Sequence, residues 1–432
     1  MATSPSSKQQ SGLSKYGDLK GRLIFLALAL VVYRIGAHVP VPGIDPDMLN
    51  QLFNQQQGGI LGLFNMFSGG ALSRFSVFAL GIMPYISASI IFQMLSYVLP
   101  SLEAIRKEGE QGRRKITQYT RYGTLALGLF QGFGIAVALE TQPGLVIDPG
   151  FLFRITTTVS LLTGTMFLMW LGEQITEFGI GNGISIILFA GILSRVPTMV
   201  SQMVDGFRAG TLKWWMALLV IVGILLLIVL ITWVNGAERR IPVQYAKRQV
   251  GRKMYGGQAS TLPMKVNMSG VLPIIFAQTI ASLPATIWAF IGTPEEGTVG
   301  RSIYNAIDTK SVLYLIVYFL MIIGFSYFYA TIQFNPVEIS NNLKRNGGFI
   351  PGFRPGKPTS DFIAKVLNKV TLFGAIYLGI VAICPLIAGK LLGNSGLAIG
   401  GTSVIIVVGV ALETVRALES QMMMRQYKGF LE

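Results

Sequence analysis

The stretch FNMFSGGALSRFSVFALGIMPYIS, residues 64–87, starts like an apolar helix and is interrupted at Ser68, Gly69 and Gly70. Glycine tolerates positive φ, so these adjacent glycines suit a hinge or a helix cap. After Arg74 the chain becomes apolar again. A broken, half-polar segment is poorly stable in lipid and is tolerated only where protein or water surrounds it. The sequence therefore predicts a non-spanning element directly before a membrane-spanning helix.

The composition of the whole chain is typical of an integral membrane protein. Of 432 residues, 51% are hydrophobic and 13% are charged, and the mean hydropathy is +0.56. The first apolar run, residues 23–32, continues without a cleavage signal, so we interpret it as a retained span rather than a signal peptide. Cys384 is the single cysteine and His38 the single histidine. An internal disulfide, a cysteine-based metal site and a multi-histidine metal site are therefore excluded, and no cofactor is expected.

Ten apolar runs approach the roughly 20 residues that a helix needs to cross a bilayer. We predict an all-α polytopic membrane protein with spans within residues 22–42, 75–98, 121–139, 153–172, 183–201, 213–235, 270–291, 312–333, 369–389 and 400–418. Pro84 is expected to bend the second of these helices, because proline removes a backbone hydrogen bond.

The distribution of basic residues predicts the orientation. With the N-terminus inside, most of the 35 Lys and Arg residues fall on cytoplasmic segments, as the positive-inside rule requires. Five plus five spans predict two inverted halves, residues 22–201 and 202–418, because an odd number of spans reverses the second half. Residues 1–21 and 419–432 are then cytoplasmic ends.

The predicted spans lack ionisable groups at their centres, and only Arg34 and Glu413 lie near span ends. Ion-coupled transporters keep such groups within the membrane, so coupling to an ion gradient is disfavoured. No Walker loop is present, so any energy source is a separate protein. A passive protein-conducting channel fits best. The alternatives are a ten-span secondary transporter of small solutes, which should show midplane charge, and a membrane-embedded enzyme, for which no catalytic residues are found.

Three cytoplasmic segments, residues 99–120, 236–269 and 334–369, carry many basic residues. The last two are about 35 residues each, longer than a connection between spans requires. Basic and aromatic side chains together indicate a docking surface for an acidic or large partner molecule. The alternative is that these segments only fix the orientation.

Six motifs in chain order resemble the SecY family of protein-conducting channels: FNMFSGGALSRFSVFALGIMPYISASII, TEFGIGNGISI, QYAKRQVGR, VNMSGVLPIIFA, PGFRPG and GGTSVIIVV. The resemblance runs from about residue 14 to about residue 425. It implies two five-helix halves that open like a clamshell around an apolar constriction at mid-membrane.

The resemblance also implies two gating elements. The pore ring would consist of branched apolar side chains, Ile82, Ile86, Ile184, Leu188, Ile275 and Ile406. A ring of this kind yields around a passing chain and offers ions no hydrogen bonds. The plug would be residues 60–74, with Phe64, Asn65, Phe67, Ser68, Gly69, Gly70 and Arg74. The alternatives are isoleucines that face only lipid or other helices, and an interfacial re-entrant segment without a gating role.

A lateral gate and a docking surface are implied as well. Gln93, Gln278 and Thr279 would line the gate, where interhelical hydrogen bonds are worth about 0.6–2 kcal/mol. Arg239, Arg240, Lys247, Arg248, Arg252 and Arg354 would dock the ribosome or the SecA motor ATPase.

The implied location is the bacterial plasma membrane, also called the inner membrane. The implied partners are SecE, SecG, SecA, the ribosome, SecDF-type and YidC-type proteins, signal sequences, unfolded preproteins and phospholipid.

Overall fold

The computed structural model describes residues 14–49, 65, 68–140, 144–210, 213–245, 248–250, 253–255, 259–268, 270–291, 311–391 and 395–428. Each predicted span contains helix within this part of the chain. Five of the described helical stretches are long and apolar enough to cross a membrane, or six if the helices Met83–Val98 and Pro100–Lys107, which are bent by 96° to each other, count as one span. The all-α fold class is therefore supported, whereas the number of ten spans stays a prediction.

The chain forms two compact units, which are described separately. The first contains Met1–Ala217, Ala285–Tyr304 and Val410–Glu432, and the second contains Leu218–Pro284 and Asn305–Gly409. The predicted inverted halves stay a prediction.

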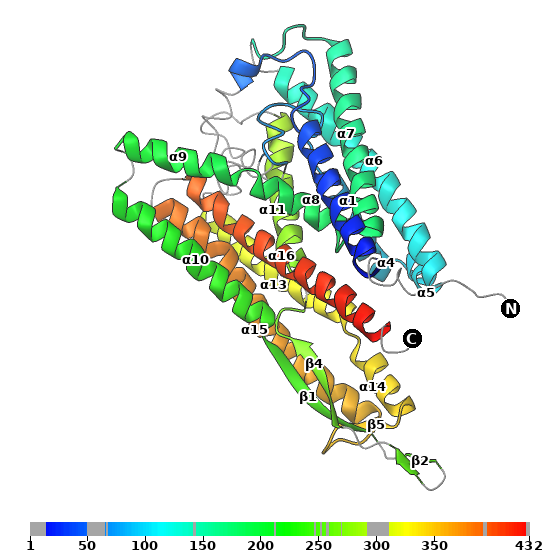
Figure 1. Cartoon of the computed structure of the whole chain (residues 1–432). Helices are drawn as coiled ribbons and strands as arrows, with labels where there is room; N and C mark the ends of the chain where they lie inside the picture. Colours follow the sequence, from blue (N-terminus) through cyan, green and yellow to red (C-terminus); the bar gives the residue numbers. More distant parts are fainter. Residues whose placement is uncertain are drawn as a thin grey trace, which may run out of the picture. The chain divides into compact units, whose positions relative to one another are not determined.

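The first unit is a helical bundle that begins with α1 (Ser14–Gly36) and continues with α4 (Met83–Val98), α5 (Pro100–Lys107), α6 (Glu110–Glu140), α7 (Phe151–Phe178), α8 (Gly183–Leu193) and α9 (Val196–Arg208). Helix α6 lies along both α4 and α7 (Figure 1). Glycines allow these close approaches, because Gly123 faces the Phe92 ring and Gly128 faces Leu162. The buried cluster beneath them includes Leu72, Phe75, Leu80, Ala136, Phe153 and Leu161.

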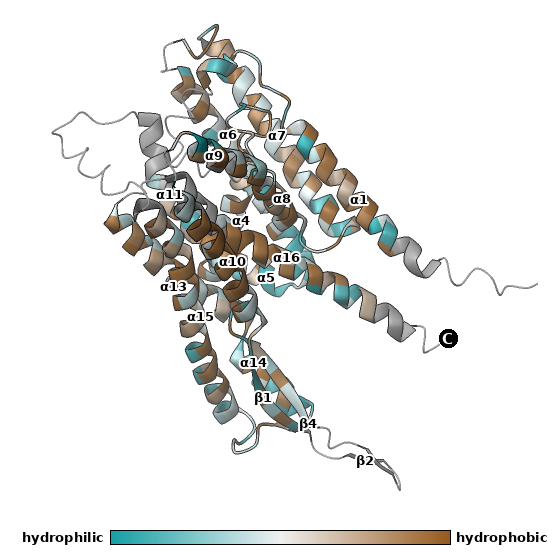
Figure 2. Cartoon of the chain, turned by 60° about the vertical axis from the view of Figure 1, so that its left-hand side comes forward, coloured by the Kyte–Doolittle hydropathy of each residue, from teal (hydrophilic) through white to brown (hydrophobic). Residues whose placement is uncertain are grey.

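The second unit combines apolar helices with a small sheet. Its helices are most of α10 (Trp214–Gly236), most of α11 (Leu272–Ile291), α13 (Val312–Gln333), α14 (Pro336–Arg345), α15 (Lys357–Leu391) and the first part of α16 (Ser395–Lys428). In Figure 2 α10 and α13 are brown along most of their length, whereas α5 of the first unit is mostly teal. This contrast separates lipid-facing helices from a helix that suits the membrane surface or water.

The sheet takes two strands from the predicted segment 236–269 and one from the segment 334–369. β1 (Glu238–Tyr245) pairs antiparallel with β4 (Ala259–Lys265), and β5 (Gly348–Phe349) pairs with the other edge of β1. The short strands β2 (Arg248–Val250) and β3 (Lys253–Tyr255) form a separate pair. Burial alternates along β1, with Ile241 and Val243 buried, as a strand with one covered face requires. Hydropathy did not predict these strands.

Two predicted helices differ in detail from the structure. Helix α4 begins at Met83 rather than at residue 75, because the preceding residues pair with the chain after α1; Val77 N–H donates to the Val39 carbonyl at 3.0 Å. Pro84 consequently lies in the first turn, where no helical hydrogen bond is lost, so the predicted bend is wrong. The predicted span 183–201 is interrupted between α8 and α9 at Ser194 and Arg195.

Candidate functional site

The segment before α4 folds as a compact turn with its own hydrogen bonds. Gly69 and Gly70 have φ values of 67° and 82°, a conformation that glycine adopts at low cost. Gly70 N–H donates to the Asn65 carbonyl at 2.8 Å, and Ser73 N–H donates to Asn65 Oδ1 at 2.9 Å. Asn65 and Ser68 are 5% and 3% exposed. The polar groups of this turn are therefore largely satisfied within it.

Among the described residues, the carbonyl groups of Ser68 and Gly69 make long hydrogen bonds to the rest of the first unit. The Gly69 carbonyl accepts from Arg34 Nη1 and Ser194 Oγ, each at 3.4 Å, and Tyr33 Oη donates to the Ser68 carbonyl at 3.4 Å. Hydrogen bonds weaken as they lengthen, so each of these contributes little. The hydrogen bonds from these two carbonyls thus hold the turn weakly, although Leu72 packs in the buried cluster of the first unit. Phe64 and Phe67 lie outside the described residues.

Arg74 follows the turn and bridges it to the end of α1. Its Nη1 lies 2.8 Å from Nε2 of His38, and its Nη2 donates to the Gly69 carbonyl at 3.5 Å. Burial lowers the pKa of Arg74 from its ordinary value, and the nearby Arg34 guanidinium lowers it further. Within the described part of the chain, the ion pairs join other residues and leave these two arginines without a carboxylate.

Four of the six predicted ring residues belong to the first unit. Ile82, at the N-cap of α4, and Ile86, one turn later, are 2% and 6% exposed, and Leu188 on α8 is 2% exposed. Ile184 is half-buried. The turn before α4 packs next to this wall, because Ser68 Cα lies 3.5 Å from a Cβ built on Gly81.

Helix α8 is held at its N-terminus by α7. Asn182 Oδ1 accepts from Ile184 N–H and Ser185 N–H, which is a standard N-cap. Thr176 Oγ1 donates to the Gly172 carbonyl at 2.8 Å and accepts from Gly183 N–H at 2.9 Å. These contacts fix the direction in which α8 presents Ile184.

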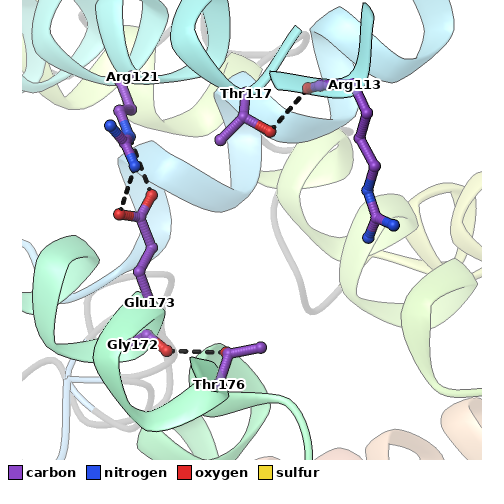
Figure 3. Close-up of polar contacts among 6 residues, drawn as sticks. All are labelled: Arg113, Thr117, Arg121, Gly172, Glu173 and Thr176. Carbon is purple, nitrogen blue, oxygen red and sulfur yellow. Dashed lines mark hydrogen bonds and ion pairs between the residues drawn. The ribbon is translucent and has the colours of Figure 1, made fainter. Parts of the chain in front are cut away.

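An ion pair fixes α7 against α6 at the same level. Arg121 donates from Nε and Nη2 to the two carboxylate oxygens of Glu173 at 3.0 and 2.7 Å, in the fork geometry shown in Figure 3. Glu173 is next to Gly172, whose carbonyl receives the Thr176 hydroxyl in the same view. Arg22 Nη1 also donates to the Gly179 carbonyl at 3.2 Å. Three helices thus support the N-terminus of α8.

We expect Gly183→Ala to destabilise the protein by about 2–4 kcal/mol. A Cβ added to Gly183 would overlap the carbonyl oxygen of Gly172, which is backbone and has little freedom to move. Thermal unfolding of the detergent-solubilised chain measures the effect. Gly223→Ala on α10 is the matched control, because a Cβ there meets nothing within 4 Å and alanine favours helix. Equal stability of the two variants would contradict the close packing of α8 on α7.

The remaining ring and gate residues are placed as follows. Ile275 and Ile406 are buried within the second unit. A single pore ring made of all six residues therefore stays a prediction. Gln278 and Thr279 on α11 are 5% and 6% exposed, and Thr279 Oγ1 donates to the Ile275 carbonyl at 2.8 Å. Gln93 on α4 is exposed and donates to Ser89 Oγ at 3.1 Å. Their meeting in a lateral gate also stays a prediction.

The predicted docking residues divide between the sheet and a rigid loop. Arg239 and Arg240 are exposed on β1, while Lys247 and Arg252 lie outside the described residues and Arg248 is described only as part of β2. Arg354 is exposed in the loop between β5 and α15. Within the described residues, no cluster of His, Cys, Asp and Glu could hold a metal.

Sequence reasoning missed the contacts of Tyr33, Ser194 and His38. Each of these polar residues stands alone near the end of an apolar run. An isolated polar residue has no periodic pattern from which its contacts could be predicted. The Arg121–Glu173 pair was also missed, although both residues lie at the ends of predicted spans, where such pairs form.

Comparison with known proteins identifies the family. The SecY family model matches residues 76–415. The chain belongs to the SecY family. Protein translocase subunit SecY of Escherichia coli strain K12 is 49% identical over 442 residues, covering 100% of this chain and 98% of that protein. The SecY subunit of Streptomyces scabiei is 44% identical over 434 residues, covering 96% of this chain and 98% of that protein.

Solved structures share the fold. A structure described as a protein conducting channel has a TM-score of 0.66 at 17% identity, covering 94% of this chain and 93% of that chain. A SecY structure described for its plug domain has a TM-score of 0.67 at 18% identity, covering 94% of this chain and 93% of that chain. Sec61 of a canine ribosome-channel complex has a TM-score of 0.62 at 16% identity, covering 94% of this chain and 93% of that chain. These structures and the family match confirm a multi-pass membrane protein of the predicted family and fold class.

Proposed function

We propose that this SecY-family chain is the protein-conducting channel subunit of a Sec translocon. It passes unfolded secretory proteins across the plasma membrane and releases membrane segments sideways into lipid. The observation that carries the proposal is the compact turn at residues 68–74, in which the Ser68 and Gly69 carbonyls make only long hydrogen bonds to α1 and Ser194, beside the buried wall of Ile82, Ile86 and Leu188. A weakly anchored element next to an apolar wall suits a plug over a pore ring.

The channel itself is passive, and we infer that it carries no catalytic centre. Energy comes from the SecA motor ATPase or from a docked ribosome, and both would meet the exposed arginines at the sheet and at Arg354. SecE and SecG complete the complex, SecDF-type and YidC-type proteins are accessory partners, and both ends of the chain face the cytoplasm. Gln93, Gln278 and Thr279 line the lateral exit for signal sequences.

Reconstitution tests this function directly. Vesicles that contain the chain with SecE and SecG, supplied with SecA, ATP and an unfolded secretory precursor, should protect the precursor from added protease. Vesicles that lack this chain should not. Uptake of a small solute without any motor protein would instead support a secondary transporter.

We expect Ile86→Asn to raise the resting ion conductance of such vesicles by about tenfold. Ile86 is 6% exposed on the wall next to the turn, and an amide there would hold water in a constriction that otherwise dewets. Conductance in a planar bilayer measures the effect. Ile91→Asn is the matched control, because Ile91 lies on the same helix and is 46% exposed. Equal conductance of the two variants would contradict the pore-ring assignment.

A further inference from the structure

The single histidine of the chain is clamped between two groups of fixed hydrogen-bonding character. His38 Nδ1 lies 2.8 Å from the Arg34 carbonyl, which can only accept, so Nδ1 carries the proton and donates. His38 Nε2 lies 2.8 Å from Arg74 Nη1, which can only donate, so Nε2 accepts with its lone pair. Both contacts are satisfied together only by the neutral ring protonated at Nδ1.

The same guanidinium reaches the plug segment. Arg74 Nη2 donates to the Gly69 carbonyl at 3.5 Å, while its Nη1 is held by His38. His38 therefore orients Arg74 towards the turn that the proposed function treats as the plug. The two bonds to the ring are the short ones in this network, and the bonds to the Gly69 carbonyl are long.

The surroundings of the ring are cationic. Arg74 Nη1 lies 2.8 Å from the ring, and the Arg34 guanidinium donates to the same Gly69 carbonyl as Arg74. Tyr33 lies beside Arg34 on α1, and Arg195 lies between α8 and α9 near Arg74. In the described part of the chain, no ion pair brings a carboxylate to any of these three arginines. A proton added to Nε2 would remove the acceptor for Arg74 and place a positive charge 2.8 Å from its Nη1.

We propose that His38 is a positioning residue for the plug, which it stabilises through Arg74 only while its ring is neutral. Acidification on the side of the membrane that His38 faces releases the Arg74 guanidinium and loosens the plug. The inference rests on the proposed function of residues 60–74. Histidine is the side chain that changes charge between about pH 5 and pH 8, and this chain has only one. A protonated ring has no lone pair at Nε2 to accept from Arg74, so the bond exists only with the neutral ring.

The test is the resting ion leak of reconstituted vesicles buffered equally on both sides. Lowering the pH from about 8 to about 5 should raise the wild-type leak by about threefold to tenfold, which matches the net contribution of one ordinary hydrogen bond, because His38 and Arg74 are exposed to water. His38→Gln offers an amide oxygen near the position of Nε2 and does not titrate, so its leak should stay low at both pH values. His38→Lys carries a permanent charge, so its leak should be high at both.

The outcomes separate this inference from the function on which it rests. A wild-type leak that does not change with pH, or the same pH response in His38→Gln, would overturn the role of His38. Deletion of residues 60–74 should raise the leak at both pH values. If the deletion has no effect, the plug assignment itself fails; if it raises the leak while the wild type shows no pH response, only the His38 inference fails.

Discussion

Replacing Arg354 with glutamate is expected to reduce SecA-driven transport into reconstituted vesicles by about tenfold or more. The loop that carries Arg354 is rigid, because the Phe353 ring stacks on Phe362 with centroids 4.1 Å apart. Thr359 Oγ1 donates to the Arg354 carbonyl at 2.8 Å, and Ser340 Oγ donates to the Gly356 carbonyl at 2.8 Å. A fixed main chain presents an exposed guanidinium, so a reversed charge would repel an acidic partner.

The control for this variant is Lys365→Glu. Lys365 is an exposed cation on α15 in the same unit, so the substitution changes the net charge equally without touching the loop. Its transport should stay near the wild-type rate, as measured by protection of the precursor from protease. Equal losses in the two variants would indicate a general charge effect, and unchanged transport by Arg354→Glu would remove the docking role.

The sequence predicted the helices well, because the length of an apolar run and the limits set by a bilayer determine where a spanning helix lies. It failed where an apolar segment is not helical. Residues 75–82 look like the start of a span, yet Val41 N–H donates to the Phe75 carbonyl at 2.9 Å, and this pairing with a distant segment delays α4 until Met83. Hydropathy does not distinguish such pairing from helix.

The break after α8 had a local signal that the prediction did not use. Pro197 lies in the first turn of α9, where proline is favoured, and indicates a new helix rather than a continued span. The partners of the plug had no such signal. The contact of Ser194 with Gly69 joins residues 125 positions apart, so it depends on how α8 packs and cannot be read from either segment alone.

Gly69→Cys and Ser194→Cys, combined with Cys384→Ser, are expected to form a disulfide at rest and to stop transport almost completely until a reductant is added. A Cβ built on Gly69 lies 3.1 Å from Ser194 Oγ. In a disulfide with an S–S bond of about 2.05 Å, the Cβ of one cysteine lies about 3 Å from the sulfur of the other. The positive φ of Gly69 costs a cysteine roughly 1–2 kcal/mol. The added Cβ would also lie 2.9 Å from Tyr33 Oη and 3.0 Å from Gly191 Cα, so the bond forms with a small shift of these neighbours.

Because the bond locks the plug against the end of α8, the transport defect must depend on oxidation. Thiol labelling measures the fraction of disulfide, and protease protection measures transport before and after reduction. The variants Gly69→Cys alone and Ser194→Cys alone, each with Cys384→Ser, carry any local strain without the bond and should respond little to the oxidant. Full transport by the oxidised pair would mean that the turn need not move, and absence of the disulfide at rest would mean that Gly69 does not lie beside Ser194 in the closed channel.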